Sequence, residues 1–161
     1  MTRIVSATPH SKSSLPDDRS YPERPWVGVG TVVWKGEQFL LIRRGKAPRL
    51  GEWSIPGGRQ ELGETVRQTA VREVKEETGV EIELLGLVDV YDAIRSDADG
   101  RVASHITLVD FAARWVAGEA VAGDDAIGVG WFTLADLPAL KLWTETEHVI
   151  RASYPLAQRG R

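Results

Sequence analysis

The sequence predicts an α/β fold in which a mixed β-sheet is flanked by helices. Two observations support this prediction. Apolar, β-branched runs recur along the chain with turn residues between them, and capping signals mark one helix in the middle of the chain and another near its end. The predicted order is two strands, a helix, three strands and a helix. Hairpins arranged around one central helix favour a sheet that is covered on both faces.

The first strands follow residue 26. Residues 27–34, with the sequence VGVGTVVW, are rich in β-branched side chains, and residues 39–42 resume the apolar pattern after a turn at residues 35–37. Residues 43–56 are predicted to form a loop, because glycines and prolines interrupt them. We therefore divide the chain into a flexible N-terminal tail, residues 1–25, and one domain, residues 26–161.

The central helix is predicted from both of its ends. Thr65 can cap its start with Gln68 three residues later, and Gly79 follows its last residue. On a helical wheel Glu73 and Glu77 fall beside the arc expected to face the core. That arc holds Val66, Ala70, Val71 and Val74.

The remaining elements alternate with polar turns. Residues 82–90, 106–116 and 129–132 are predicted strands, separated by a turn at residues 97–100 and a Gly/Asp-rich loop at residues 118–128. Thr144 and Glu147 form a second capping-box pattern, which predicts a C-terminal helix.

Composition excludes several classes of protein. The 161 residues carry a net charge of -3, which argues against a protein that binds nucleic acid through bulk positive charge. The absence of cysteine excludes disulfides, thiol nucleophiles and cysteine-ligated zinc. The N-terminal residues lack the apolar core of a signal peptide, and no apolar run reaches the roughly 20 residues of a membrane span. We therefore expect a cytoplasmic protein that does not enter membranes.

The central helix also indicates a metal site. Two partly buried carboxylates one turn apart, Glu73 and Glu77, repel each other unless a cation or strong donors compensate them. Arg72 can neutralise one carboxylate, but Glu76 adds a third to the same patch. Because the chain has no cysteine and only three scattered histidines, the expected ligands are oxygens, which suit Mg²⁺ or Mn²⁺.

The residues around this helix follow a recognisable spacing. They are Gly58, Glu64, Arg72, Glu73, Val74, Glu76, Glu77, Gly79 and Val80. This pattern resembles the signature of the Nudix hydrolase family, and every fixed position of the signature is matched. The resemblance implies an α/β/α sandwich that hydrolyses a nucleoside diphosphate linked to another moiety, X. Further segments, including residues 40–58 and 104–126, look like a bacterial subgroup described as ADP-ribose pyrophosphatase-like.

The resemblance also implies roles for individual residues. Arg72 would orient the carboxylates, and Glu64 would add a further anionic contact. The general base would be one of the metal-binding glutamates, Glu73, or an acid on the late loop. That loop offers Glu119, Asp124 and Asp125, of which Asp125 is nearest the expected position. The implied metal ligands are the carbonyl of Gly57 and the side chains of Glu73, Glu76 and Glu77.

A basic segment leads into the signature. It contains Arg43, Arg44, Lys46 and Arg49. These side chains could hold terminal phosphates or simply form a solvated hairpin end. Trp53 could belong to the core or offer a stacking face to a base. We therefore name Arg43, Arg44, Arg49 and Trp53 as candidate substrate-binding residues.

Three functions remain open from the sequence. The first is hydrolysis of a nucleoside diphosphate derivative, with ADP-ribose giving AMP and ribose 5-phosphate as the best example. The second is hydrolysis of nucleoside triphosphates, including oxidised ones, with release of pyrophosphate. The third is a non-catalytic module that binds a nucleotide. In each case the partner is a small-molecule nucleotide, and a homodimer is left open.

Overall fold

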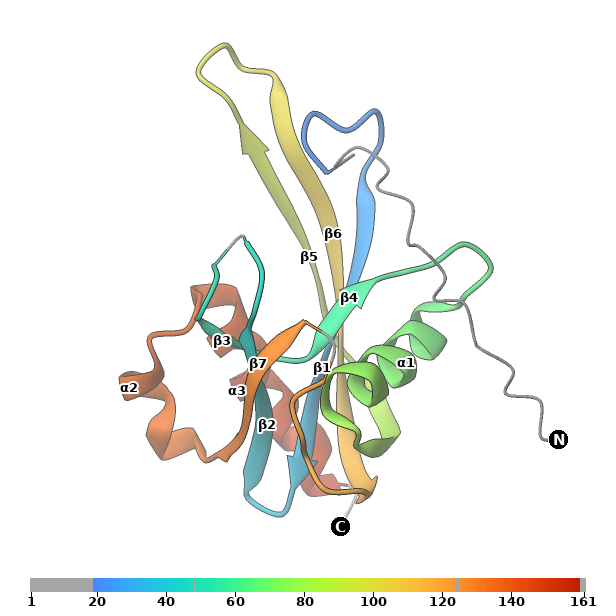
Figure 1. Ribbon diagram of the computed structural model, residues 1–161, viewed down its shortest axis with the longest axis vertical. Coiled ribbons are helices and arrows are strands. Elements are labelled where there is room, and N and C mark those ends of the chain that lie inside the picture. The colour runs from blue at the N-terminus through green and yellow to red at the C-terminus, as the bar shows by residue number, and fades with distance from the viewer. Residues whose placement is uncertain (1–18, 48, 124, 160–161) are drawn as a thin grey trace, which may run out of the picture.

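The computed structural model describes residues 19–47, 49–123 and 125–159, and it contains the predicted mixed sheet (Figure 1). Strand β1 (Trp26–Lys35) turns at Gly36, where φ is 62°, into β2 (Gln38–Arg44). Strands β5 (Glu81–Ser96) and β6 (Val102–Ala117) form a second, longer hairpin.

The sheet has seven strands in the described part of the chain. Its main path runs β3-β2-β1-β6-β5, with β4 paired to β1 and β7 (Ala126–Phe132) paired to β2. Strands β3 (Trp53–Ser54) and β4 (Gly57–Arg59) are short. The β1–β6 pair is parallel, whereas the other pairs are antiparallel, so the sheet is mixed as predicted.

Helices cover both faces of this sheet. Helix α1 (Val66–Thr78) lies on one face, where its buried Val74 packs with Val33 of β1. Helix α3 (Thr144–Arg159) lies on the other face, where Ile150 packs with Val32 of β1 (Figure 1). Because successive side chains of a strand point to opposite faces, β1 contributes to both cores. The predicted α/β/α layering is confirmed.

Several local predictions were wrong. Residues 43–56 are not only loop, because Trp53–Ser54 pairs with β2, and strand β5 continues past residue 90 to Ser96. A 3-10 turn (Leu134–Asp136) and helix α2 (Leu137–Leu140) were not expected. Thr144 is the first residue of α3 and not its cap. Val71, placed in the core by the helical wheel, is 43% exposed.

The described end of the N-terminal segment contacts the tip of the β5–β6 hairpin. The Tyr21 N–H donates to the Ala103 carbonyl at 3.0 Å, its hydroxyl donates to Asp97 Oδ2 at 3.0 Å, and the Arg101 guanidinium lies over its ring. Most of the predicted tail, residues 1–18, lies outside the described residues.

Within the described part of the chain, no helix has the length and apolar character needed to cross a membrane.

A buried hydrogen bond joins β1 to α3, and it gives the first prediction. The Trp34 Nε1–H donates to the Ser153 hydroxyl at 2.9 Å, and Ser153 is fully buried. Ser153→Ala leaves the indole N–H without this partner, so we expect the free energy of unfolding to fall by about 1–3 kcal/mol in urea titrations. The exposed Ser96→Ala is the matched control. Equal stability of the two variants would mean that this bond contributes nothing.

Candidate active site

The start and end of α1 fix the positions of its glutamates. The Thr65 hydroxyl accepts from the Gln68 N–H, and the Gln68 side chain accepts from the Thr65 N–H, which is the predicted capping box. Gly79 ends the helix with φ 72°, in the left-handed region that glycine adopts without strain. Since residues three and four apart share a helix face, these ends place Glu73, Glu76 and Glu77 on one side of α1.

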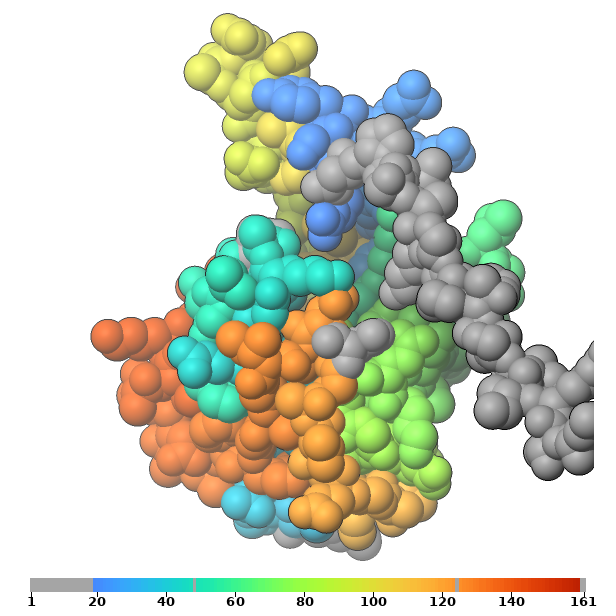
Figure 2. Space-filling model, in the orientation of Figure 1, coloured from blue at the N-terminus to red at the C-terminus, as the bar shows by residue number. Residues whose placement is uncertain are grey.

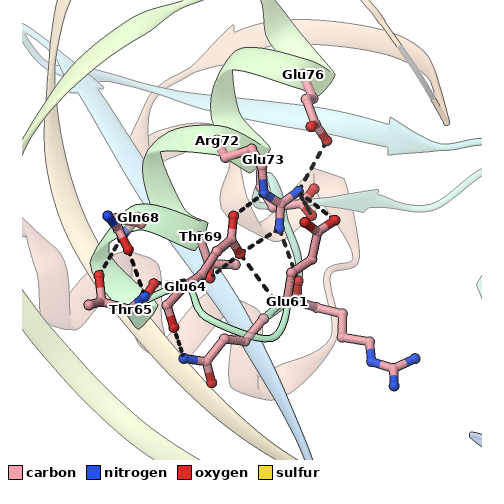
Figure 3. A network of polar contacts seen from close by, with 10 residues as sticks. Glu61, Glu64, Thr65, Gln68, Thr69, Arg72, Glu73 and Glu76 are labelled. Carbon is pink, nitrogen blue, oxygen red and sulfur yellow. Dashed lines mark hydrogen bonds and ion pairs between the residues drawn. The ribbon is translucent and has the colours of Figure 1, made fainter.

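Arg72 lies at the centre of a cluster of carboxylates (Figure 3). Its Nε donates to Glu64 Oε1 at 2.5 Å and its Nη2 to Glu64 Oε2 at 3.0 Å. Its Nη1 donates to Glu73 at 2.8 Å and to Glu76 at 3.2 Å, and its Nη2 also donates to the Arg59 carbonyl. The hydrogen bonds from Arg72 lower the pKa of Glu64 to about 2, so Glu64 stays ionised.

Glu77 lies in a different environment from these paired carboxylates. Burial raises its pKa to about 8, repulsion by Glu73 adds to the increase, and a hydrogen bond from the Gly57 N–H at 3.2 Å opposes it. This position beside the apolar side of α1 is the one that the helical wheel predicted. The site therefore contains a carboxyl whose charged form is poorly solvated.

The glycine pair at the start of the signature, Gly57 and Gly58, allows the sheet and α1 to approach closely. Gly57 and Gly58 pair with Gly30 and Val29 of β1. A Cβ atom at Gly58 would lie 2.3 Å from the Glu73 carboxyl carbon, and one at Gly57 would lie 2.3 Å from the Val29 carbonyl oxygen. At Gly57 only glycine fits against the main chain of β1, whereas a side chain at Gly58 would displace the Glu73 carboxylate from its place in the site.

The late loop brings Asp125 near the glutamates. Its carboxylate forms an ion pair of 2.6 Å with Lys46, and its charge is one of the influences that raise the pKa of Glu77. Glu119 is exposed. Asp124, the third acid that we considered, lies outside the described residues.

The candidate substrate-binding residues make different contacts, although Arg43 and Trp53 are direct partners across β2 and β3. Arg44 is close enough to Glu77 to lower its pKa. The Arg43 Nε donates to the Gly51 carbonyl at 2.8 Å, and the Arg49 guanidinium lies 4.3 Å above the Trp143 ring. Trp53 packs edge-on against Phe132 beside the core cluster on the α3 face. Of the two interpretations of Trp53, a core residue or a stacking face for a base, this packing favours the core residue.

One buried acid near the site was missed by the sequence analysis. Asp110 of β6 is 5% exposed, and burial followed by repulsion from Asp89 raises its pKa to about 6. A Cβ atom at Gly30 would lie 2.3 Å from Asp110 Oδ1, so this side chain occupies the space above that glycine. A single acid inside the apolar run of residues 106–116 was the available signal.

The ligand chemistry of the site fits a divalent cation. Among the described residues, however, no group of three acidic or histidine side chains is already arranged to coordinate one. Arg72 is bonded to Glu73 and Glu76, while burial disfavours the charged form of Glu77. A cation beside Glu77 would relieve that penalty, and carboxylate oxygens are suitable ligands for it.

The raised pKa of Glu77 gives the second prediction. Because about 8 lies above its ordinary value of 4.5, the native state binds this proton more tightly than the unfolded chain. The parent's free energy of unfolding should therefore fall as pH rises from about 4.5 to about 8, relative to that of Glu77→Gln. Thermal melts in EDTA should show equal stability at low pH and a more stable variant above pH 8. A constant difference across this range would identify Glu77 as a well-paired charge.

Comparisons with known proteins agree with this geometry. A family model described as NUDIX domain matches residues 24–153. An ADP-ribose pyrophosphatase of Methanocaldococcus jannaschii is 39% identical over 127 residues, which cover 79% of this chain and 72% of the relative. A mouse 8-oxo-dGDP phosphatase is 31% identical over 139 residues, covering 84% of this chain and 40% of that protein. The crystal structure of a MutT NUDIX hydrolase from Burkholderia pseudomallei has a TM-score of 0.70 and 32% identity, covering 81% and 98% of the two chains. The chain therefore belongs to the Nudix hydrolase family.

Proposed function

We propose that this hydrolase is a Mg²⁺- or Mn²⁺-dependent pyrophosphohydrolase that converts ADP-ribose, or a similar nucleoside diphosphate derivative, to AMP and a sugar phosphate. The arrangement of Glu64, Arg72, Glu73, Glu76 and Glu77 around one helix is the observation that carries this proposal. The name of the archaeal relative, 39% identical, favours ADP-ribose.

The metal ligands in this proposal are the Gly57 carbonyl and the side chains of Glu73, Glu76 and Glu77. A bound divalent cation would neutralise charge on the diphosphate oxygens. Arg72 holds Glu73 and Glu76 on the same side of α1, and its bonds to Glu64 fix the guanidinium. Glu64 and Arg72 thus act by organising the carboxylates.

Proton removal from the attacking water needs a base within hydrogen-bond reach of it. Asp125 is our first choice, because its loop brings it close to Glu77, and Glu73 is the second. Arg44, near the same carboxylates, is well placed to contact a phosphate. Arg43 and Arg49 are exposed and stay in the proposal as phosphate contacts, whereas Trp53 is half-buried against Phe132.

A second candidate function is hydrolysis of nucleoside triphosphates, including oxidised ones. The name of a Bacillus subtilis relative, a putative 8-oxo-dGTP diphosphatase that is 32% identical over 108 residues, favours it. The name of the mouse relative indicates an oxidised nucleotide but a diphosphate. A purely binding role is less well supported, because a nucleotide sensor has no need for all three glutamates on α1.

The third prediction tests both the metal and the substrate. With Mg²⁺, chromatography should show AMP and ribose 5-phosphate from ADP-ribose, and excess EDTA should abolish turnover. Nucleoside triphosphates, run in parallel, should yield little monophosphate and pyrophosphate. Glu77→Gln should be inactive, and Mg²⁺ should raise its melting temperature less than that of the parent. Full turnover in EDTA would contradict the metal assignment, and preference for triphosphates would favour the second candidate function.

The fourth prediction concerns the base. Asp125→Asn keeps the size of the side chain and removes its proton acceptor, so kcat should fall by roughly 10²–10⁴-fold. Glu119→Gln, an exposed acid on the same loop, is the control and should retain near-parent activity. Equal, small effects of the two substitutions would return the role of base to Glu73.

A further inference from the structure

The late loop that carries Asp125 is attached to two different elements. At one end the Val121 N–H donates to the Thr78 carbonyl at 3.0 Å, and the Gly123 N–H donates to the Glu77 carbonyl at 2.9 Å, so the loop is fixed to the end of α1. At the other end the Gly45 N–H, just after β2, donates to the Asp125 carbonyl at 2.8 Å. The main chain of Asp125 is therefore held between α1 and β2.

The contact with β2 depends on close packing of main chains. A Cβ atom at Gly45 would lie 2.3 Å from the Asp125 carbonyl oxygen and 3.0 Å from the side chain of Ile127. The β2–β7 register also shifts between Arg43 and Arg44, directly before this contact. Lys46 follows directly after Gly45, and its ammonium group reaches Asp125 on this loop.

Two different basic side chains pair with the carboxylates around the site. Arg72 is bonded to Glu64, Glu73 and Glu76, whereas Lys46 forms its 2.6 Å ion pair with Asp125. Lys46 offsets part of the repulsion between the carboxylates of Asp125 and Glu77. Because both side chains of the pair are more than half exposed, at 67% and 53%, the pair itself contributes little to stability.

We propose that Lys46 is a positioning residue that holds the carboxylate of Asp125 toward the glutamates of α1, where Asp125 can accept the proton of the attacking water. This inference rests on the proposed function, in which Asp125 is the base. Lys46 itself makes and breaks no bond in the reaction. Its effect passes entirely through Asp125, which distinguishes it from a lysine that binds the substrate's phosphates.

A double-mutant cycle tests this inference. Lys46→Met keeps the length of the apolar stem and removes the charge. It should lower kcat by about two- to fivefold with little change in KM, because an exposed ion pair shifts the position of its carboxylate by no more than that factor. Lys46→Arg should restore most of the activity. The double variant Lys46→Met, Asp125→Asn should be no slower than Asp125→Asn alone, because both changes remove the same function.

The control is Lys75→Met, in which the lost lysine pairs with Glu81 at 3.3 Å and lies on the exposed side of α1. It should leave kcat and KM unchanged. The melting temperatures of all variants should match that of the parent, and this agreement would establish that the variants are folded. If the parent is active, two results would contradict the role of Lys46 and leave the proposed function intact. One is additive losses of kcat in the double variant, and the other is a raised KM with unchanged kcat for Lys46→Met. A parent without metal-dependent turnover would overturn the proposed function and this inference together.

Discussion

The geometry of the site depends on one guanidinium that bonds to three glutamates and lies 3.9 Å from a fourth, Glu61. Glu64, Glu73 and Glu76 converge on Arg72, and unit charges 4 Å apart near a protein surface interact by about 4 kcal/mol. Such a group of like charges would push itself apart without a cation between its members. Arginine suits this position because its planar fork offers five donors, whereas lysine would provide a single point of charge.

This arrangement creates two kinds of carboxyl within one site. Glu64, bonded to Arg72 through both oxygens, has a pKa of about 2, while burial raises the pKa of Glu77 to about 8. Environments that move neighbouring pKa values apart are a common feature of catalytic sites, because each group then keeps a defined protonation state. Here the difference arises from location. Glu64 precedes α1 and is bonded to Arg72, whereas Glu77 lies on α1 and accepts from the Gly57 N–H of β4.

Much of this site could be predicted because its determinants are local. The cap at Thr65, the left-handed Gly79 and the helical period between them fix where Glu73 and Glu77 lie, and all three are readable from the sequence. Contacts set by tertiary packing could not be predicted in this way. Val71 has the same apolar character as Val74, yet it is 43% exposed whereas Val74 is fully buried. Trp53 packs against Phe132, which lies far along the chain.

The short strands were missed for a similar reason. Two or three residues give no periodic pattern, so Trp53–Ser54 and Gly57–Arg59 become strands only because β2 and β1 offer them partners.

The dependence of strands on distant partners also affects how the molecule folds. Strand β1 carries the glycine pair of the site on one edge, but its other edge pairs with β6 in parallel, with Trp26 opposite Ile106. Pairing between such distant segments is slow, because a long loop must close before any contact compensates for the lost entropy. During synthesis, the glutamate helix is therefore made well before β6, and the whole site, with Asp125 and the adjoining β7, can assemble only after residue 132 has emerged.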